Sequence, residues 1–400
     1  GRTQVAILTL LGSGGVNYAC HDIRVYAERI EYMKIRHIVC VIGMAVMVLP
    51  ATAQTLLATG DLSPIAQVSP VPDAYNEVDE AYTVLVEETI SRGGTAVEQF
   101  LNQDFDALRE QFSPEAADAL SAEMLEQTLA EIIAQPLGEK RSERILPLGG
   151  VTAYMANYAW GESALTVTVY FDASGQIGGL NVAPDEPLPD DPAQAYVSET
   201  LFQLPFAGLW YTAWGGSDRL HNYHVDAPPQ RHAYDFVVWQ EGSTFSGDGL
   251  QNEDYYAYGQ PALAPATGTV IAVVDELPDN QPQVETDEQH PAGNHVVIQT
   301  GEAEYVFLAH LQPGSIAVEP GQTVESGQLV GLVGNSGNTS EPHLHIHLQN
   351  QPELFVTNEH DEPTAFTDAI GLPLHFSNYL ENGVPIEHGE PVGGTFVQND

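Results

Sequence analysis

The sequence predicts a small α+β domain followed by a larger, mainly antiparallel β domain. Apolar residues recur at helical spacing from about residue 75 to 136, and they alternate as in strands from 151 to 182. From residue 205 onward, short β-rich runs are bounded by Gly, Pro, Asn and Asp. The chain has 400 residues, of which 43% are hydrophobic. It is therefore long enough to bury two cores.

The beginning of the chain contains a segment with the form of a secretory signal peptide. Residues 33–53 start with Met33, carry two basic residues, continue with an apolar run of 12 residues and end in Ala-Thr-Ala. A membrane-spanning helix needs about 20 apolar residues. We therefore predict cleavage before Gln54 and no stable membrane insertion afterwards. Because a signal peptide begins a protein, we interpret residues 1–32 as an upstream extension outside the fold.

Composition limits the chemistry of the remaining chain. Cys20 and Cys40 both precede the predicted cleavage site, so a metal bound by the mature chain would need His and carboxylate ligands. Residues 1–53 hold five basic and three acidic residues, which leaves 7 basic and 52 acidic residues and a formal net charge of −45. This charge opposes binding to nucleic acid and to anionic lipid, because both are polyanions.

The N-terminal domain is expected at residues 76–183, between two linkers. Residues 54–75 contain three prolines and predict an extended linker, and the charged, proline-rich run PDEPLPDDP begins a second linker at 184–204. Ser113 and Pro114 interrupt the helical stretch and are typical of a helix start. Helices followed by a short antiparallel sheet predict a small α+β accessory domain without catalytic chemistry.

The C-terminal domain is expected at residues 205–390, with a tail at 391–400. Its strand-like runs are separated by turn residues at regular spacing, which predicts a compact antiparallel sheet. The runs are 262–265, 268–274, 294–300, 304–311 and several within 319–349. Two long loops, 241–258 and 275–293, are expected to flank a cleft. Three tyrosines in the first loop either contact a substrate or pack the loop: Tyr255, Tyr256 and Tyr258.

The run HLHIH at 343–347 is the strongest chemical signal. Alternation on a strand places His343, His345 and His347 on one face, where they form a row of possible metal ligands. A catalytic zinc site usually takes three His, Asp or Glu ligands and leaves a position for water. His347 shares this face, so it either supports a neighbouring ligand or is a solvent-exposed histidine of the strand, and we favour the second interpretation.

A second group of possible ligands lies in the segment RLHNYHVDAPPQRHAYDFVV at 219–238. Asp235 falls in an apolar strand, where an ionised carboxylate is costly unless it is paired or bound to a metal. His221, His224 and His232 are all near it. His232 stands three residues before Asp235 on the same strand and should point to the opposite face, which favours His224 without excluding the others.

The C-terminal domain resembles the lysostaphin-like (LytM-type) peptidoglycan metalloendopeptidases. Separate segments match in order, including NYHVDAPPQRHAYDFVV, GNHVVI, FLAHLQPGSIAVEPGQTVESGQLVGLVGNSGNTSEPHLHIHLQ and GLPLHF. The resemblance implies one zinc ion per chain, held by His224 or a neighbour, Asp235 and His345. It also implies two catalytic histidines, His310 and His343. The chain departs from the commonest pattern, in which a histidine stands four residues before the aspartate, because Arg231 occupies that place.

The resemblance further implies a secreted endopeptidase that cuts peptide cross-links of bacterial peptidoglycan, in the periplasm or at the cell wall. Alternatives are a non-catalytic relative that binds the wall or activates another hydrolase, and a metallopeptidase that acts on proteins. All five polar positions are present, which favours catalysis. The sequence does not decide which of His310 and His343 acts as base and which as acid.

Overall fold

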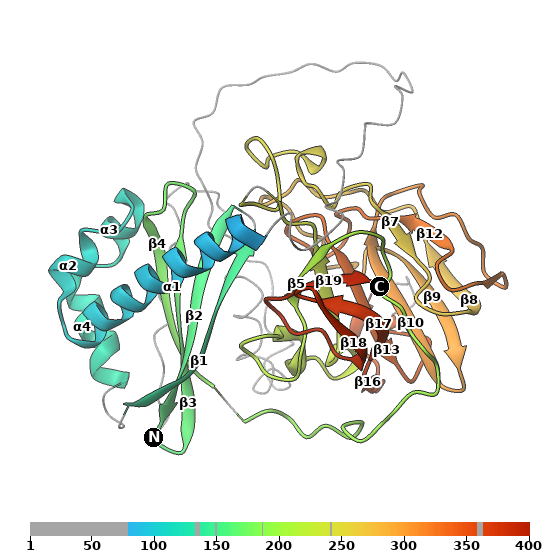
Figure 1. Ribbon diagram of the computed structural model, residues 1–400, viewed down its shortest axis with the longest axis horizontal. Coiled ribbons are helices and arrows are strands. Elements are labelled where there is room, and N and C mark those ends of the chain that lie inside the picture. The colour runs from blue at the N-terminus through green and yellow to red at the C-terminus, as the bar shows by residue number, and fades with distance from the viewer. Residues whose placement is uncertain (1–78, 133–136, 149, 186, 241, 358–362) are drawn as a thin grey trace, which may run out of the picture.

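The computed structural model describes residues 79–132, 137–148, 150–185, 187–240, 242–357 and 363–400. The expected upstream extension, signal peptide and first linker, residues 1–75, lie outside the described residues. In the described part, four α-helices precede a four-stranded sheet and then a large antiparallel sheet (Figure 1). The predicted fold class, an α+β part followed by a mainly antiparallel β part, is confirmed.

The N-terminal part combines the helices with an antiparallel meander of strand order β1-β2-β3-β4. Its elements are α1 (Asp79–Leu101), α2 (Phe105–Arg109), α3 (Pro114–Ala119), α4 (Ala122–Ile132), β1 (Leu137–Leu148), β2 (Val151–Trp160), β3 (Ser163–Phe171) and β4 (Ile177–Asp185). The long helix α1 packs across β1, β2 and β3 (Figure 1). Ser113 caps α3 as predicted, because its hydroxyl accepts a hydrogen bond from Ala116 N at 3.1 Å.

Strand β1 was not predicted, and its composition explains why. Its first half carries the charged run Glu139, Lys140 and Arg141, which is exposed and shows no apolar alternation. The strand lies at the edge of its sheet, where charged side chains prevent pairing with other chains. Its second half is buried, including Ile145 and Leu146.

The C-terminal part is built around a sheet of strand order β11-β8-β9-β10-β13-β6-β5-β19-β17-β18, with β16 paired to β13. Its strands are β5 (Trp210–Trp214), β6 (Tyr234–Val237), β7 (Pro261–Leu263), β8 (Gly268–Val274), β9 (Asn294–Gly301), β10 (Glu304–Leu311), β11 (Thr323–Val324), β12 (Leu329–Leu332), β13 (Leu344–Gln349), β14 (Phe355–Thr357), β15 (Pro363–Phe366), β16 (Gly371–Leu372), β17 (Phe376–Glu381), β18 (Val384–Gly389) and β19 (Phe396–Asn399). The predicted strand runs correspond to β7 to β13.

Two segments expected to lie outside the domains take part in the fold. The sequence predicted a tail at 391–400, but β19 pairs with both β5 and β17 inside the large sheet. Within the expected linker 184–204, Phe202 is buried and forms a bridge with Phe376. Pairing partners that lie far away in sequence decide both placements, so local composition could not reveal them.

A shared hydrophobic cluster joins the two sheets. Leu146 and Ala153 of the N-terminal sheet pack in one buried cluster with Tyr211, Trp239 and Phe396 of the C-terminal part. Tyr82 of α1 also contacts this cluster, and its ring lies edge-on to Phe396 with the centroids 4.8 Å apart. The N-terminal part therefore packs directly against the sheet that carries the candidate site.

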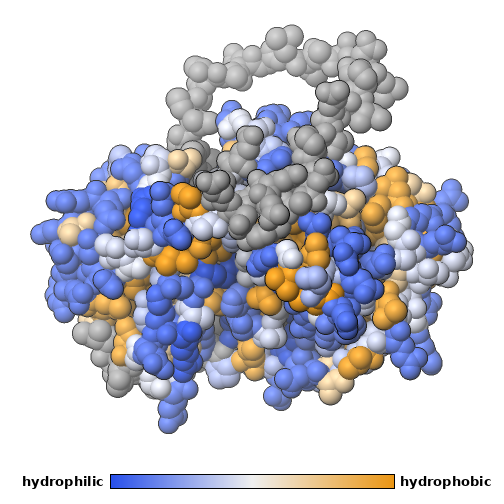
Figure 2. All heavy atoms as spheres, in the orientation of Figure 1, coloured by the Kyte–Doolittle hydropathy of each residue, from blue (hydrophilic) through white to orange (hydrophobic). Residues whose placement is uncertain are grey.

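The surface is mostly hydrophilic on the face shown in Figure 2, with separate small hydrophobic areas. The exposed large hydrophobic side chains are scattered along the described chain, from Val84 to Val392. No helix in the described residues is long and apolar enough to cross a membrane.

Candidate metal centre

Asp235 and His345 face each other across two neighbouring strands. Residue pairing between β6 and β13 places Asp235 directly opposite His345, so both side chains project from the same face of the sheet. His345 Nδ1 lies 2.8 Å from Asp235 Oδ1. Both residues are buried, at 3% and 4% exposure for His345 and Asp235. The site therefore begins with a carboxylate and an imidazole held by the sheet itself.

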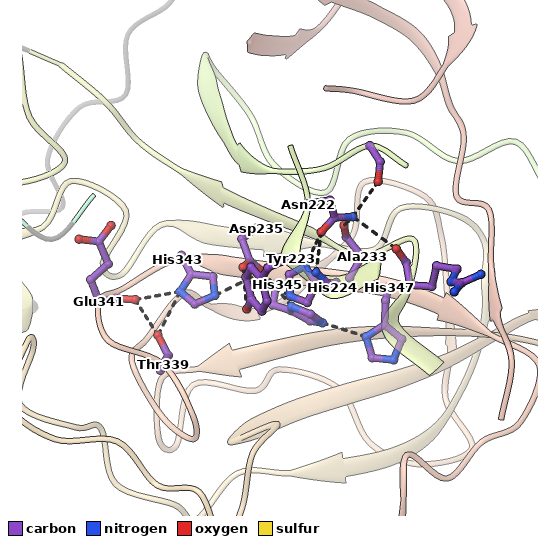
Figure 3. A network of polar contacts seen from close by, with 12 residues as sticks. Asn222, Tyr223, His224, Ala233, Asp235, Thr339, Glu341, His343, His345 and His347 are labelled. Atoms are coloured by element: carbon purple, nitrogen blue, oxygen red, sulfur yellow. Dashed lines mark hydrogen bonds and ion pairs between the residues drawn. The ribbon is translucent and has the colours of Figure 1, made fainter. Parts of the chain in front are cut away.

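His224 reaches the same carboxylate from a separate segment. It lies in the short 3-10 helix η2 (Tyr223–Asp226), which precedes β6. Its Nε2 is 3.6 Å from Asp235 Oδ2, and its ring is 3% exposed (Figure 3). The chain can make this approach because two short 3-10 helices, Tyr223–Asp226 and Pro228–Gln230, turn it before β6 begins.

Asn222 fixes the orientation of the His224 ring. Its amide nitrogen donates to the carbonyl oxygens of Gly216, Arg231 and Ala233, so its Oδ1 is the atom that faces His224. Oδ1 lies 2.8 Å from His224 Nδ1 and accepts that proton. His224 Nε2 is thereby left with its lone pair toward Asp235, as a metal ligand requires.

His310 projects into the site from a distortion in β10. The pairing of β10 with β9 shifts between Leu308 and Leu311, and His310 has a left-handed φ of 61°. Such a backbone costs about 1–3 kcal/mol and is found mainly at functional sites. The carbonyl of Ser336 accepts the Nδ1 proton of His310 at 2.8 Å. Its Nε2 is then the nitrogen that remains free for chemistry.

His343 lies just before β13. The centroids of the His343 and His310 rings are 4.8 Å apart. Its Nδ1 donates to the carbonyl oxygen of Glu341 at 2.9 Å and lies 3.0 Å from the Thr339 hydroxyl (Figure 3). Its Nε2 lies 3.5 Å from Asp235 Oδ1. His310 and His343 therefore present the same ring nitrogen to one space beside Asp235.

Burial and the charges of neighbouring groups shift the pKa values at the site. Those of His224, His310 and Asp235 are lowered, and that of His343 is raised. Burial lowers the pKa of His224 to about 3, against the opposing effect of the Asp235 charge. Burial also lowers the pKa of His310 well below its usual value. Burial raises the pKa of the Asp235 carboxyl, but the charges and hydrogen bonds of His224, His343 and His345 together outweigh burial, so its pKa lies well below the usual range. Burial lowers the pKa of His343, but Asp235 and Glu341 together outweigh burial, so that pKa is above its usual value.

Two sets of side chains bring possible ligand atoms within 4.8 Å of one another: His224, Asp235 and His345, and His310, His343 and His345. The first set combines two imidazoles with a carboxylate that is buried but remains ionised, which is a common donor set of catalytic zinc sites. A bound cation would also offset the cost of burying that negative charge. These residues fit a zinc ion by donor chemistry and spacing.

The alternative histidines of the sequence analysis lie elsewhere. His232 Nε2 is 3.1 Å from Asp191 Oδ2, and His221 Nδ1 is 2.9 Å from Asp218. Neither belongs to a possible ligand set among the described residues. The interpretation of His347 as solvent-exposed was wrong, because its side chain is buried at 1% exposure and lies 2.9 Å from His345 Nε2. Its burial comes from stacking on Phe307 of β10, a contact that alternation within one strand does not reveal.

The structure shows how two tyrosines of the first long loop, 241–258, are packed. Tyr255 is 2% exposed and donates its hydroxyl proton to the Gly249 carbonyl, so it packs its own loop. Tyr256 is likewise buried. From the second loop, Asn280 donates to the carbonyl of Gly337, close to the turn that precedes His343.

Two residues of the site were missed by the sequence analysis. Asn222 and Tyr223 immediately precede His224, and the Tyr223 hydroxyl lies 3.3 Å from Asp235 Oδ2. The Tyr223 ring also lies over His224, with the centroids 4.0 Å apart. Their place beside a candidate ligand in the run NYH was the available signal.

Comparison with known proteins agrees with the family resemblance seen in the sequence of the C-terminal part. Residues 254–355 match the model of Peptidase family M23. The peptidoglycan DD-endopeptidase ShyA of Vibrio cholerae is 40% identical over 90 residues, which make up 22% of this chain and 20% of ShyA. An uncharacterized metalloprotease of Haemophilus influenzae is 33% identical over 87 residues, or 22% of this chain and 15% of that protein. The chain thus matches a fifth or less of the length of these relatives.

Among solved structures, the chain is similar to a mutant catalytic domain of the prophage-encoded M23 protein EnpA from Enterococcus faecalis. The likeness has 21% sequence identity and a TM-score of 0.24, and it covers 38% of this chain and 88% of that one. The family match contains His310, His343 and His345, whereas His224 and Asp235 lie before it. The C-terminal part of the chain thus contains a match to Peptidase family M23, at residues 254–355.

Proposed function

We propose that this protein is a secreted zinc-dependent endopeptidase that hydrolyses peptide cross-links of bacterial peptidoglycan. The observation that carries the proposal is the meeting of His224, Asp235 and His345, from three separate segments, with their ligand atoms within 4.8 Å. The family match supports peptidase chemistry, and the name of the ShyA relative supports peptidoglycan as the substrate class. The predicted signal peptide at 33–53 supports export to the periplasm or cell wall.

In this proposal His224, Asp235 and His345 hold one zinc ion per chain. When bound, zinc supplies Lewis acidity, which polarises a peptide carbonyl and makes a water molecule easier to deprotonate at neutral pH. The protein fixes the three ligands before binding, because Asn222 orients His224 and the strand pairing orients Asp235 and His345. The cost of ordering these side chains is met during folding.

His310 and His343 are the proposed proton-transfer groups. Each donates its Nδ1 proton to a backbone carbonyl, so each has Nε2 available to accept or release a proton at the same space beside Asp235. One histidine takes the proton from the attacking water, and the other gives a proton to the amine that leaves when the peptide bond breaks. Their ring centroids are 4.8 Å apart, which suits proton transfer by both histidines within one small site.

We further propose that the region from residue 205 onward is catalytic and that residues 76–183 have an accessory role. The accessory region carries none of the proposed ligands or proton-transfer residues.

Metal content and peptidoglycan release test the proposal together. The protein from residue 54 onward is purified beside three variants: Asp235→Ala, His345→Ala and, as a matched control, His388→Ala, which removes an exposed histidine on β18. We expect about one zinc per chain and release of soluble peptides in the wild type and the control. Both properties should be lost in the two ligand variants.

Other outcomes identify the alternatives. A wild type that binds peptidoglycan without metal and without releasing peptides would replace the proposal with a non-catalytic wall-binding role. A zinc-containing wild type that cuts unfolded proteins but not peptidoglycan would keep the metal site and change the substrate class.

A further inference from the structure

Beyond the proposed ligands, a line of buried polar side chains continues along β13. His345, His347 and Gln349 stand two residues apart, so they project from the same face of the strand. His347 and Gln349 are 1% and 0% exposed. Polar side chains buried this deeply need hydrogen-bond partners, and the partners here form a directed chain.

The chain of hydrogen bonds begins at Gln349. Its Nε2 donates to two backbone carbonyl oxygens, that of Gln351 at 2.8 Å and that of Glu353 at 3.0 Å. Carbonyl oxygens only accept, so these contacts define which end of the amide is nitrogen. The Gln349 oxygen, Oε1, must then point the other way, and it lies 3.3 Å from His347 Nε2.

The orientation of Gln349 determines the protonation pattern of His347. Oε1 can only accept, so His347 Nε2 carries the proton of the neutral ring, and His347 Nδ1 is an acceptor. Phe307 holds the ring plane in place by stacking on it, with centroids 4.6 Å apart and an interplanar angle of 11°. The acceptor Nδ1 faces His345 Nε2 at 2.9 Å.

His345 is thereby set in one tautomer. Its Nε2 donates to His347, so its Nδ1 keeps a lone pair, directed at Asp235 Oδ1 at 2.8 Å. Two acceptor atoms at this distance repel each other unless a cation or a proton lies between them. The arrangement along β13 therefore prepares His345 Nδ1 to bind a cation shared with Asp235.

We propose that His347 and Gln349 are positioning residues that hold His345 in the tautomer whose Nδ1 binds the metal. This inference rests on the proposed metal site and adds the residues that orient one of its ligands. Histidines that bind metals commonly donate their second ring proton to a partner that fixes the ring. Here a neutral imidazole takes that place, itself oriented by an amide.

Zinc affinity of matched variants at residue 347 tests the proposal. His347→Leu keeps an apolar side chain against Phe307 but removes the acceptor, whereas His347→Asn keeps an oxygen acceptor close to the position of Nδ1. We expect His347→Leu to weaken zinc binding by roughly 10- to 100-fold, as measured by competition with a chelator, because partners of metal ligands commonly contribute that much. His347→Asn should recover most of the lost affinity.

A second variant covers the case in which His347→Leu does not fold. Gln349→Met keeps a long side chain but removes the amide that orients His347, and it should weaken zinc binding in the same direction. Circular dichroism and thermal unfolding of the metal-free proteins check that each variant is folded. NMR of the histidine ring nitrogens should show His345 protonated at Nε2 in the metal-free wild type and His347→Asn, and a mixture of tautomers in metal-free His347→Leu and Gln349→Met.

The outcomes separate this inference from the proposed function. Wild-type zinc affinity in folded His347→Leu and Gln349→Met, or equal losses in His347→Leu and His347→Asn, would overturn the positioning role while leaving the metal site intact. A wild type that binds no zinc through Asp235 and His345 would instead overturn the proposed function.

Discussion

Asp235 and His345 are directly paired across β6 and β13, and their side chains meet at 2.8 Å between Oδ1 and Nδ1. They are 110 residues apart in the chain. The sheet brings them together because the β6–β13 register is set by the apolar residues on the other face, such as Phe236 opposite Leu344. A shift of this register by one residue would point one of the two polar groups into the core.

The three histidines near Asp235 in sequence should differ in their effect on zinc content. His224→Ala should remove bound zinc, because its Nε2 is the one that faces Asp235 at 3.6 Å. His232→Ala and His221→Ala should keep about one zinc per chain, since their rings contact Asp191 and Asp218 instead. Metal analysis of the three purified variants decides the question, and zinc loss in His232→Ala alone would contradict the assignment.

Replacing either proposed proton-transfer histidine should separate metal binding from activity. His310→Ala and His343→Ala should retain zinc but lose peptide release by about 10²- to 10⁴-fold, the usual contribution of a general acid or base. Zinc content and release rate are measured on the same preparation. Loss of zinc in both variants would favour the alternative ligand set of His310, His343 and His345.

Gly293 should be essential for the placement of His310. It has a φ of 58°, and a Cβ added there would lie 2.1 Å from the Ser336 carbonyl oxygen, which accepts the His310 Nδ1 proton. Gly293→Ala should therefore lower both stability and activity. Gly314→Ala is the matched control, because its φ is 71° and no atom lies within 4 Å of the added Cβ.

Both glycine variants carry the strain of a left-handed alanine, about 1–2 kcal/mol. Only Gly293→Ala should also displace Ser336 and reduce the rate of peptide release. Thermal unfolding and release rates are compared for the two variants, and equal losses of activity would show that the Ser336 contact has no role.

Arg144 should stabilise the contact between the two sheets. It is buried on β1 and donates to the carbonyl oxygens of Ala213, Leu220 and His221 in the C-terminal part. Arg144→Leu should lower the free energy of unfolding by about 2–4 kcal/mol, because the carbonyls of Ala213 and Leu220 lose this donor and such losses cost about 1–3 kcal/mol each without being fully additive. The His221 carbonyl still accepts from Gly215 N.

Denaturant unfolding measures this loss, with Arg144→Lys as the comparison. Lysine keeps the charge but cannot reach three carbonyls in fixed geometry, so it should recover only part of the stability. An unchanged unfolding midpoint in Arg144→Leu would mean that the hydrophobic cluster around Tyr211 and Phe396 alone holds the two parts together.

Local patterns in the sequence determined much of the C-terminal fold. The strand runs from 262 to 349 were predicted because each is short, rich in β-branched residues and bounded by turn residues. Period-two alternation also placed His343, His345 and His347 on one face of a strand. These features depend on neighbours in the chain, so sequence alone carries them.

Only the tertiary structure decided the features that depend on distant partners. Strand β19 is recognised by its pairing with β5 and β17, and His347 is buried because Phe307 of another strand covers it. The sequence favoured His224 over its neighbours, but the fold decides which ring faces Asp235, because that depends on how the segment before β6 folds back. Alternation along one strand fixes the side of the sheet that a residue faces, whereas burial and ligand distance are set by whatever the rest of the chain places on that side.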